Sequence, residues 1–559
     1  MDIDETKQVI LVVLDGWGIA PPGPGNAITQ SPTPNFTRYW ASFPHAQLLA
    51  SGEAVGLPKG EDGNTETGHL NLGAGRIIYQ DLQRINMSIA DGSFFENNTL
   101  KGAFTHAKAN NSNLHLMGLI GAGGVHSNID HLFALLQFAR KENFTRVFFH
   151  LFTDGRDSAP TSAKIYISLI RDVIKKENLG TIASVMGRYW AMDRDLRWDR
   201  TAKAYFALTK GEGKFVKTPE EAIDASYSQG KTDEFIEPAI ITGESSKPLG
   251  VIGENDAVIF FNFRVDRPRQ LSRAFVLKEF ENKTGEMEFD PYRIKYEKTH
   301  LGTPDVTRPT FNRGAQLDNL YFVTMTEYEK ILVDNGARVA FAPEFINMPL
   351  GRILSENHMH QLRVAESEKE RFVTYYFNGL QGNFDKQQNL IIPSPKVPTY
   401  DLKPEMSARE VTSAVLQKLK NGDYPFTLIN LANADMVAHT GNIGATVTAC
   451  KVLDECIGEL ANYVLAYGGY LLLTADHGNA EEMINLETGA IDTEHSTFPV
   501  PFVAISKDFL NNSVSLDVGI LADVAPTILA LLDVPQPVEM SGRNLLGKVL
   551  ETVKRKSFA

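Results

Sequence analysis

The chain has little cysteine and lacks any long apolar run, and both shortages limit the class of protein. Its 559 residues include only two cysteines, Cys450 and Cys456, in a segment with helical character, where this spacing places them on different turns. Such a spacing does not favour a disulfide, and reduced thiols are typical of a cytosolic protein. No apolar run approaches membrane-span length, and the acidic N-terminus lacks the features of a signal peptide. We therefore expect a cytoplasmic protein that has no membrane partner.

An excess of positive charge is also missing. The chain has 55 Lys and Arg against 68 Asp and Glu, a formal net charge of -13. This balance argues against nonspecific binding to nucleic acid or to a membrane surface. Tandem repeats and extended low-complexity tracts are absent as well, and the 43% hydrophobic content is enough for more than one core.

The strongest indication of chemistry is T-A-D-H-G-N, residues 474–479, which follows the apolar run Tyr470 to Leu473. Asp476 and His477 supply a carboxylate and an imidazole, the ligand types that Mn²⁺ or Zn²⁺ accept. Successive residues at a strand end point in opposite directions, so this pair favours two neighbouring ions over one shared ion. A two-metal site for phosphoryl transfer is therefore the first hypothesis.

Further ligand candidates lie at other predicted strand ends. Asp435 and His439 follow an apolar run at spacing i, i+4, which places both on one face of a helix. Asp15 ends the apolar run Val9 to Leu14, and His495 precedes a strand punctuated by proline. Any one of them has a plainer interpretation as a turn residue or a solvated helix face. Together they lie where open α/β sheets place their ligands, which favours the metal site.

A nucleophile and an anion site are also indicated. Thr65 lies in the polar loop G-N-T-E-T-G-H, where its hydroxyl could reach a metal ion and lose its proton, although such a residue is more often a turn or cap. In the middle of the chain, guanidinium groups recur in motifs with Gly and Asp, a pattern that suits an acid carrying both carboxylate and phosphate. These are Arg156, Arg188, Arg194, Arg264 and Arg267.

Short apolar runs separated by helix-length segments predict an α/β fold with buried parallel sheets. The predicted strands include Val9 to Leu14, Val258 to Phe261, Thr427 to Leu431 and Tyr470 to Leu473. Because ligand candidates lie near both ends of the chain, the metal domain must be discontinuous, with a second domain inserted. We expect the metal domain at 1–79 and 320–559 and the inserted substrate-binding domain at 80–319. Loop expansions are expected near 280–290 and 384–388.

Ten motifs occur in order along nearly the whole chain. They are V-V-L-D-G-W-G, G-N-T-E-T-G-H, G-G-V-H-S-N, D-G-R-D-S-A-P, G-R-Y-W-A-M-D-R-D-L-R-W-D-R, F-N-F-R-V-D-R-P-R-Q, E-S-E-K-E-R-F, L-A-N-A-D-M-V-A-H, T-A-D-H-G-N and H-S-T-F-P-V-P-F. This set resembles the cofactor-independent (2,3-bisphosphoglycerate-independent) phosphoglycerate mutases of the alkaline phosphatase superfamily. The resemblance implies an alkaline-phosphatase-like metal domain into which a second α/β domain is inserted.

Carried over to this sequence, the resemblance implies two ion sites. One ion would be held by Asp15, Thr65, Asp476 and His477, and the other by Asp435, His439 and His495. We expect Mn²⁺, with Mg²⁺, Co²⁺ or Zn²⁺ as the other candidates. Two positions depart from the family pattern: Thr65 stands where the family usually has Ser, and Asn128 where it commonly has His. Thr keeps the hydroxyl but adds a methyl group and a stiffer χ1, which concerns the rate more than the reaction.

The resemblance also implies roles for groups that bind or act on the substrate. The five arginines would bind it, and His126 would hold the migrating phosphate. Asp157 would serve a glycerate hydroxyl as general acid and base. Lys369, which by itself indicates one charge of a solvated helical run, would contact the phosphoryl group in the transition state.

The implied function is interconversion of 3-phosphoglycerate and 2-phosphoglycerate, as in glycolysis and gluconeogenesis, without bisphosphoglycerate and through phosphorylated Thr65. A metal-dependent phosphomonoesterase or phosphopentomutase of the same superfamily is one alternative. It would share the ligands but would not need the D-G-R-D and G-R-Y-W-A-M-D-R motifs. A catalytically impaired phosphoglycerate-binding protein is the other, and the seven filled ligand positions argue against it. We expect a monomer whose partner is a small-molecule substrate.

Overall fold

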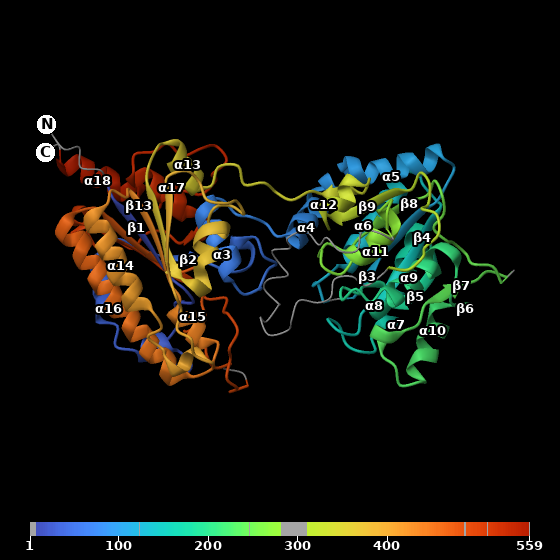
Figure 1. Cartoon of the computed structure of the whole chain (residues 1–559), viewed down its shortest axis with the longest axis horizontal. Helices are drawn as coiled ribbons and strands as arrows, with labels where there is room; N and C mark the ends of the chain where they lie inside the picture. The colour runs from blue at the N-terminus through green and yellow to red at the C-terminus, as the bar shows by residue number, and fades with distance from the viewer. Residues whose placement is uncertain are drawn as a thin grey trace. The chain divides into compact units, whose positions relative to one another are not determined.

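The structure, a computed structural model, describes residues 7–121, 123–244, 246–280, 310–485, 488–510 and 512–557. The chain divides into two compact units (Figure 1). Unit 1 is Met1–Gln80 together with Phe345–Ala559, and unit 2 is Asp81–Glu344. Unit 1 is thus built from both ends of the chain, and unit 2 from its middle.

The second boundary differs from the predicted one. We expected the chain to return to the metal domain at residue 320, but it does so after residue 344. Two strands account for the difference, because β9 (Tyr321–Thr326) pairs with β8 (Ala257–Phe260) and β10 (Arg338–Phe341) pairs with β9. The loop before β9 looks like a linker in the sequence, but the sheet of unit 2 continues beyond it.

Unit 1 is centred on a mixed sheet of eight strands among the described residues. In order across the sheet they are β12 (Gln387–Ile392), β11 (Gln361–Glu366), β13 (Phe426–Leu431), β1 (Val9–Leu14), β14 (Tyr470–Thr474), β15 (Val500–Ile505), β2 (His45–Leu49) and β16 (Gly519–Ile520). The strands from β12 to β14 are parallel, and β15 is antiparallel to both of its neighbours. Every residue of β1 is fully buried, as expected for an apolar strand covered on both faces.

Helices cover both faces of this sheet, and Figure 1 shows α14 and α16 on one side and α3, α13 and α17 on the other. The helices of unit 1 are α1 (Ala27–Gln30), α2 (Pro34–Ser42), α3 (Thr65–Ala74), α13 (Leu350–Glu356), α14 (Ala408–Asn421), α15 (Asn433–Ala438), α16 (Ile443–Tyr467), α17 (Val524–Leu531) and α18 (Gly547–Ser557). A short turn of 3-10 helix, η4 (Ser367–Lys369), follows β11 and is followed by a π-helical turn at Phe372–Tyr376.

Unit 2 has its own sheet, also of eight strands in the described part of the chain. In order they are β10, β9, β8, β3 (Leu114–Ile120), β4 (Val147–Thr153), β5 (Thr181–Gly187), β7 (Ala239–Ile241) and β6 (Lys214–Val216). The pairs are parallel except β5 with β7. Side chains of β3 alternate between two cores, with Leu116 in one and Met117 in the other, so this sheet is also buried on both faces.

Nine helices of unit 2 lie in its described residues. They are α4 (Asp81–Asp91), α5 (Asn98–Ala109), α6 (Ile129–Lys141), α7 (Ala163–Glu177), α8 (Arg188–Ala191), α9 (Trp198–Lys210), α10 (Pro219–Tyr227), α11 (Arg269–Val276) and α12 (Lys330–Asp334). Side chains from α4 to α7 join the core that contains Leu116, and side chains from α9 and α11 join the core that contains Met117.

The predicted α/β class and the predicted strands are confirmed, with ends that differ by one residue at most. Cys450 and Cys456 lie buried in α16 and are not joined by a disulfide, as expected. The loop expansion predicted near 280–290 lies, from residue 281 on, outside the described residues. The one predicted at 384–388 runs into a strand, because β12 begins at Gln387. Within the described segments, no helix has the length and apolar character needed to cross a membrane.

Candidate active site

The predicted metal ligands all lie in unit 1, where the chain leaves or approaches its sheet. Asp15 follows β1, and Asp435 lies in α15, directly after β13. Asp476 and His477 follow β14, and His495 precedes β15. Because β13, β1 and β14 are parallel neighbours, their carboxyl ends meet at one edge of the sheet. The topology therefore collects side chains that are more than 400 residues apart in sequence.

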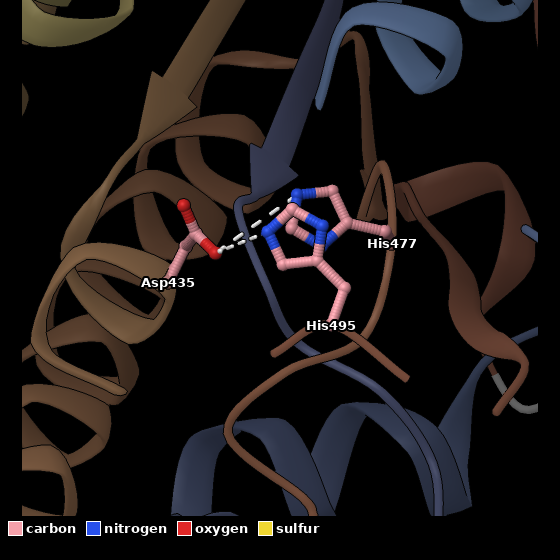
Figure 2. Close-up of side chains that lie close together, drawn as sticks. All are labelled: Asp435, His477 and His495. Atoms are coloured by element: carbon pink, nitrogen blue, oxygen red, sulfur yellow. Dashed lines mark ion pairs between the residues drawn. The ribbon is translucent and has the colours of Figure 1, made fainter. Parts of the chain in front are cut away.

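One group of ligand atoms gathers around Asp435. Figure 2 shows its carboxylate facing the rings of His477 and His495, and Asp435 Oδ1 lies 3.4 Å from His495 Nε2 and 4.0 Å from His477 Nε2. His439 adjoins the group, with its Nε2 3.1 Å from Asp435 Oδ1 and 3.2 Å from His495 Nε2. The predicted spacing i, i+4 thus places Asp435 and His439 on one face.

A second group consists of Asp15, Asp476 and His477. His477 Nε2 lies 3.5 Å from Asp15 Oδ1 and 3.6 Å from Asp476 Oδ2. The prediction that Asp476 and His477 point in opposite directions is therefore wrong. It assumed an extended chain, but β14 ends at Thr474 and the next residues form a bend, in which side chains no longer alternate. His477 belongs to both groups.

Backbone carbonyls fix the orientation of the three imidazoles. Nδ1 of His439 lies 2.7 Å from Thr493 O, that of His477 lies 3.1 Å from Gly478 O, and that of His495 lies 2.9 Å from Gly63 O. A carbonyl oxygen can only accept, so Nδ1 must carry the proton in each contact. In the neutral ring Nε2 then has a free lone pair, and in all three residues this atom faces Asp435.

Thr65 is the first residue of α3, whose N-cap is Asn64. The Asn64 side chain accepts a hydrogen bond from Thr67 N at 2.9 Å, which fixes the first turn of the helix. Thr65 Oγ1 lies 2.8 Å from His477 Nε2 and 3.3 Å from Lys369 Nζ. The hydroxyl therefore contacts His477, the imidazole that belongs to both metal-ligand groups.

Lys369 is buried at the end of η4, and the interpretation of its sequence as a solvated helical run is wrong. Its Nζ donates to Asp15 Oδ1 and to Asp435 Oδ2, each at 2.8 Å. The chain turns sharply after β11, so Lys369, within the charged run E-S-E-K-E-R, faces the interior. Lys369 thus stands as a cation between the carboxylates of the two groups and beside Thr65.

Charge pairing outweighs burial in this centre. Burial disfavours the protonated imidazole of His477, but the carboxylates of Asp476, Asp435 and Asp15 raise its pKa to about 10. Burial likewise opposes the charge of Lys369, but Asp15 and Asp435 raise the pKa of this ammonium above its ordinary value. Burial also disfavours the charged form of Asp435, yet Lys369 and the neighbouring histidines hold its pKa well below the usual range. Asp435 therefore stays ionised despite its burial and attracts cations.

The donor set fits divalent ions. Carboxylate oxygens and imidazole nitrogens are ligands for Mn²⁺, Co²⁺ and Zn²⁺. Asp476 Oδ2 is buried and accepts no hydrogen bond from the described residues. It lies 3.2 Å from His69 Nδ1, but that atom is 3.0 Å from Thr65 O, which takes its proton. A buried carboxylate oxygen without a donor is costly, and a bound cation would satisfy it.

The predicted substrate residues gather in unit 2, again beyond strand ends. His126 follows β3, Asp157 follows β4, Arg188 follows β5, and Arg264 follows β8. These four strands are parallel neighbours, so the segments that follow them meet at one edge of the sheet. Arg267 joins the same cluster, and its Nη1 donates to Met192 O at 3.2 Å.

Two sets of carboxylates hold the cluster together. Arg188 Nη1 donates to Asp154 Oδ1 at 2.6 Å and to Asp157 Oδ2 at 2.5 Å. Asp266 accepts from Arg194 Nη1 at 2.6 Å and lies 3.4 Å from Arg264 Nε. Sequence reasoning missed Asp154 and Asp266, although both stand in motifs that it quoted. Arg156 is half-exposed, and its Nε lies 3.8 Å from Glu234.

His126 lies between the two sets, 3.6 Å from Asp157 Oδ2 and 3.5 Å from Asp266 Oδ1. Burial lowers its pKa to about 4, and the nearby guanidinium groups help to outweigh Asp266. His126 is therefore a neutral ring at pH 7. Asp157 is ionised there, since its hydrogen bond and charge pairing with Arg188 outweigh burial and lower its pKa. Positive charge exceeds negative charge among these side chains, so the cluster suits an anion.

Comparison with known proteins decides the family. A family model described as "BPG-independent PGAM N-terminus" matches residues 85–330. A 2,3-bisphosphoglycerate-independent phosphoglycerate mutase from Moorella thermoacetica is 47% identical over 550 residues, which is 98% of this chain and 100% of that protein. One from Clostridium beijerinckii is 46% identical over 541 residues, 97% of this chain and 99% of that protein. The chain belongs to this mutase family.

A solved structure agrees with that assignment. The phosphoglycerate mutase of Leishmania mexicana, whose structure was determined at low cobalt concentration, is 28% identical to this chain. It matches with a TM-score of 0.56 and covers 97% of this chain and 98% of its own. The predicted family and the predicted enzyme class, a 2,3-bisphosphoglycerate-independent phosphoglycerate mutase, are confirmed.

Sequence reasoning missed residues of this mutase that contact the ligands without being ligands themselves. Asn430 Nδ2 donates to Asp15 Oδ2 at 2.7 Å and lies 3.2 Å from His69 Nε2. Asn479 Nδ2 donates to Asp435 Oδ1 at 2.9 Å. Asn430 could have been found from the sequence, because it is a polar residue inside the apolar strand β13. His69 and Asn479 stand within quoted motifs, but nothing in the motifs indicated which ligand each would contact.

Proposed function

We propose that this chain transfers a phosphoryl group between O3 and O2 of glycerate through phosphorylated Thr65. The observation that carries the proposal is the position of Thr65 Oγ1, 2.8 Å from His477 Nε2 and 3.3 Å from Lys369 Nζ in a buried centre of carboxylates and imidazoles. A threonine that was only a helix cap would not need these neighbours.

We assign one divalent ion to Asp15, Thr65, Asp476 and His477 and a second to Asp435, His439 and His495. When bound, the ions would supply positive charge that favours loss of the hydroxyl proton and offsets the charge of the phosphoryl group. Mn²⁺ is the ion that we expect, and the mixed carboxylate and imidazole set accepts it. The Leishmania mexicana structure was determined at low cobalt concentration, which supports a divalent ion of similar chemistry here. No bisphosphoglycerate enters the reaction.

The two steps balance without a further reactant. Thr65 Oγ, without its proton, attacks phosphorus, the bond to O3 breaks, and O3 takes up a proton. The 2-hydroxyl then gives its proton to Asp157 and attacks phosphorus, and the bond to Thr65 Oγ breaks. Because Asp157 is ionised near neutral pH, it can accept this proton, which O3 of the next substrate takes up. Lys369 carries positive charge beside Thr65 and would contact the phosphoryl oxygens.

The cluster of unit 2 would bind the substrate's charged groups. Guanidinium groups bind carboxylate and phosphate through paired hydrogen bonds, and neutral His126 can donate one more to the migrating phosphate. The arginines in this role are Arg156, Arg188, Arg194, Arg264 and Arg267. We infer a monomer that acts on a small molecule and binds neither nucleic acid nor a membrane.

Mass spectrometry of enzyme quenched with substrate tests the proposal. We expect a phosphate on Thr65. Thr65→Ala should abolish turnover, because no hydroxyl is left to accept the phosphoryl group, whereas Thr65→Ser should keep or improve it. A coupled assay after metal removal and re-addition, run without bisphosphoglycerate, gives the rates. Phosphate found only on other residues, or normal turnover in Thr65→Ala, would sink the proposed mechanism.

A further inference from the structure

One buried carboxylate that is not among the ligands contacts three of the segments that carry them. Glu481 accepts hydrogen bonds from Gly18 N at 3.0 Å, from Asn479 N at 2.9 Å and from Ser496 Oγ. Its side chain is almost fully buried. Each donor stands within three residues of a ligand, and these ligands are Asp15, His477 and His495.

The same segments leave room for the Glu481 carboxylate. A Cβ atom built on Gly18 would lie 2.2 Å from Glu481 Cδ, and one built on Gly478 would lie 2.1 Å from Glu481 Oε1. Both separations are too short for real atoms, so neither position accepts a side chain while the carboxylate is in place. The absence of side chains at Gly18 and Gly478 lets two loops close onto one group.

Chemistry explains why this group is a carboxylate. A carboxyl group has two oxygens, which can accept hydrogen bonds from several donors at once. Of its two backbone donors, Asn479 N also donates to Gly16 O at 3.1 Å, whereas Gly18 N donates to Glu481 and would be costly to leave unpaired. Backbone bonds join the loops pairwise, with Ser496 N donating to Gly478 O at 3.1 Å and Ala480 N donating to Gly16 O at 3.0 Å. Glu481 joins all three segments at a single point.

We propose that Glu481 is a positioning residue for the metal centre. Its carboxylate holds the segments after β1, after β14 and before β15 in the places from which Asp15, His477 and His495 reach common ions. This inference rests on the proposed function, because it concerns the ligands of the same centre. Partner groups that orient ligands typically contribute ten- to a hundredfold in metal affinity.

Three variants test the role. Glu481→Ala removes the acceptor, and Glu481→Gln keeps a carbonyl oxygen for the two N–H groups and an amide that can donate to Ser496 Oγ. Glu482→Ala is the matched control, because Glu482 is the next residue, is partly exposed, and its side chain makes no hydrogen bond or ion pair within the described part of the chain. Each purified full-length protein is stripped of metal and titrated with Co²⁺, and the visible absorption of the bound ion reports its ligand geometry.

We expect Glu481→Ala to bind Co²⁺ about ten- to a hundredfold more weakly and with an altered spectrum. Glu481→Gln and Glu482→Ala should resemble the wild type in both respects. In Glu481→Ala, kcat should fall while the KM for phosphoglycerate stays the same, since the cluster of unit 2 is intact. Wild-type affinity and spectrum in Glu481→Ala would overturn the role, as would a Glu481→Gln variant as weak as Glu481→Ala or an equal loss in Glu482→Ala.

If circular dichroism shows that Glu481→Ala does not fold, the Ser496→Ala variant tests the role of Glu481 instead. It removes one donor of the three and should weaken Co²⁺ binding by less than tenfold while the fold is kept, and unchanged binding would overturn the role. Wild-type protein that binds no Co²⁺ would overturn the metal centre together with this inference. Wild-type binding that Glu481→Ala leaves unchanged would overturn only the role of Glu481.

Discussion

Arg264 and Asp435 carry opposite charges in different units, and their loss should have different consequences. Arg264→Ala removes a guanidinium from the anion cluster and should lower kcat/KM by about 2 to 4 kcal/mol in transition-state free energy, with bound metal unchanged. Asp435→Ala should instead lower the metal content, because this carboxylate faces three imidazoles. Elemental analysis combined with steady-state kinetics distinguishes the two variants. Loss of metal in Arg264→Ala alone would contradict the assignment of the two sites.

Individual residues were predictable where strand ends placed them. The four carboxylate and imidazole positions after or before strands of unit 1 were found because a parallel sheet brings its carboxyl ends together. The directions in which the Asp476 and His477 side chains point were not predictable, since they depend on a bend that the sequence does not reveal. Lys369 shows the same limit: its neighbours are charged, and only the turn after β11 makes it interior.

Among the elements, β11 ends in a carboxyl group that is almost fully buried, Glu366. Its Oε1 accepts a hydrogen bond from Ser407 N at 2.9 Å, but burial, aided by Glu410 and Glu368, raises its pKa to about 7. The unfolded chain releases this proton near pH 4.5 and the folded chain only near 7, so the folded state binds more protons between these values. This group therefore makes the protein less stable as pH rises through that window.

Glu366→Gln should remove this dependence, because Gln keeps an acceptor for Ser407 N but does not ionise. Relative to wild type, the variant should gain up to about 3 kcal/mol in free energy of unfolding between pH 5 and pH 8. Urea unfolding of both proteins at the two pH values, followed by a signal from unit 1, measures the gain. An equal difference between the proteins at both pH values would show that Glu366 is not the titrating group.

A polar chain across four strands of unit 2 shows what strand prediction leaves out. His115 Nε2 lies 3.1 Å from Asp256 Oδ2, its Nδ1 lies 2.9 Å from His150 Nε2, and His150 Nδ1 lies 2.8 Å from Ser184 Oγ. The chain runs from the start of β8 through β3 and β4 to β5, within the interior. Of these four strands, an apolar run predicted β8, as Val258 to Phe261. The pairing of these side chains depends on strand order and register, which a single sequence does not give.

For the whole molecule, the discontinuous plan followed from ligands near both ends of the chain, whereas the second boundary did not, because β9 and β10 continue a sheet beyond a loop. The same division predicts where metal acts. Adding Mn²⁺ to stripped protein should slow hydrogen exchange at residues 433–441 and 475–481, since binding stabilises the folded form that holds the ion. Peptides from β3 and β4 in unit 2 should exchange at the same rate with and without Mn²⁺.

Excess chelator should reverse the protection and remove activity, and re-addition should restore both. Acidification should likewise remove the protection and lower the activity, because the ligand imidazoles must be neutral to bind an ion. Hydrogen exchange followed by mass spectrometry provides the measurement. Equal protection of both units, or full activity in chelator with metal shown to be absent, would contradict the two-metal interpretation.

The central position of β1 has a consequence for synthesis. This strand leaves the ribosome long before its neighbours, because Val9 pairs with Phe426 and Tyr470, which are translated more than 400 residues later. At about 5 to 20 residues per second, the wait is roughly 20 to 80 seconds. Residues 81–344 are contiguous and can complete their sheet during that time. An apolar strand meanwhile has no native neighbour on either side, so the nascent chain depends on the cell to shield it, and any message cut short before β14 yields an aggregation-prone product.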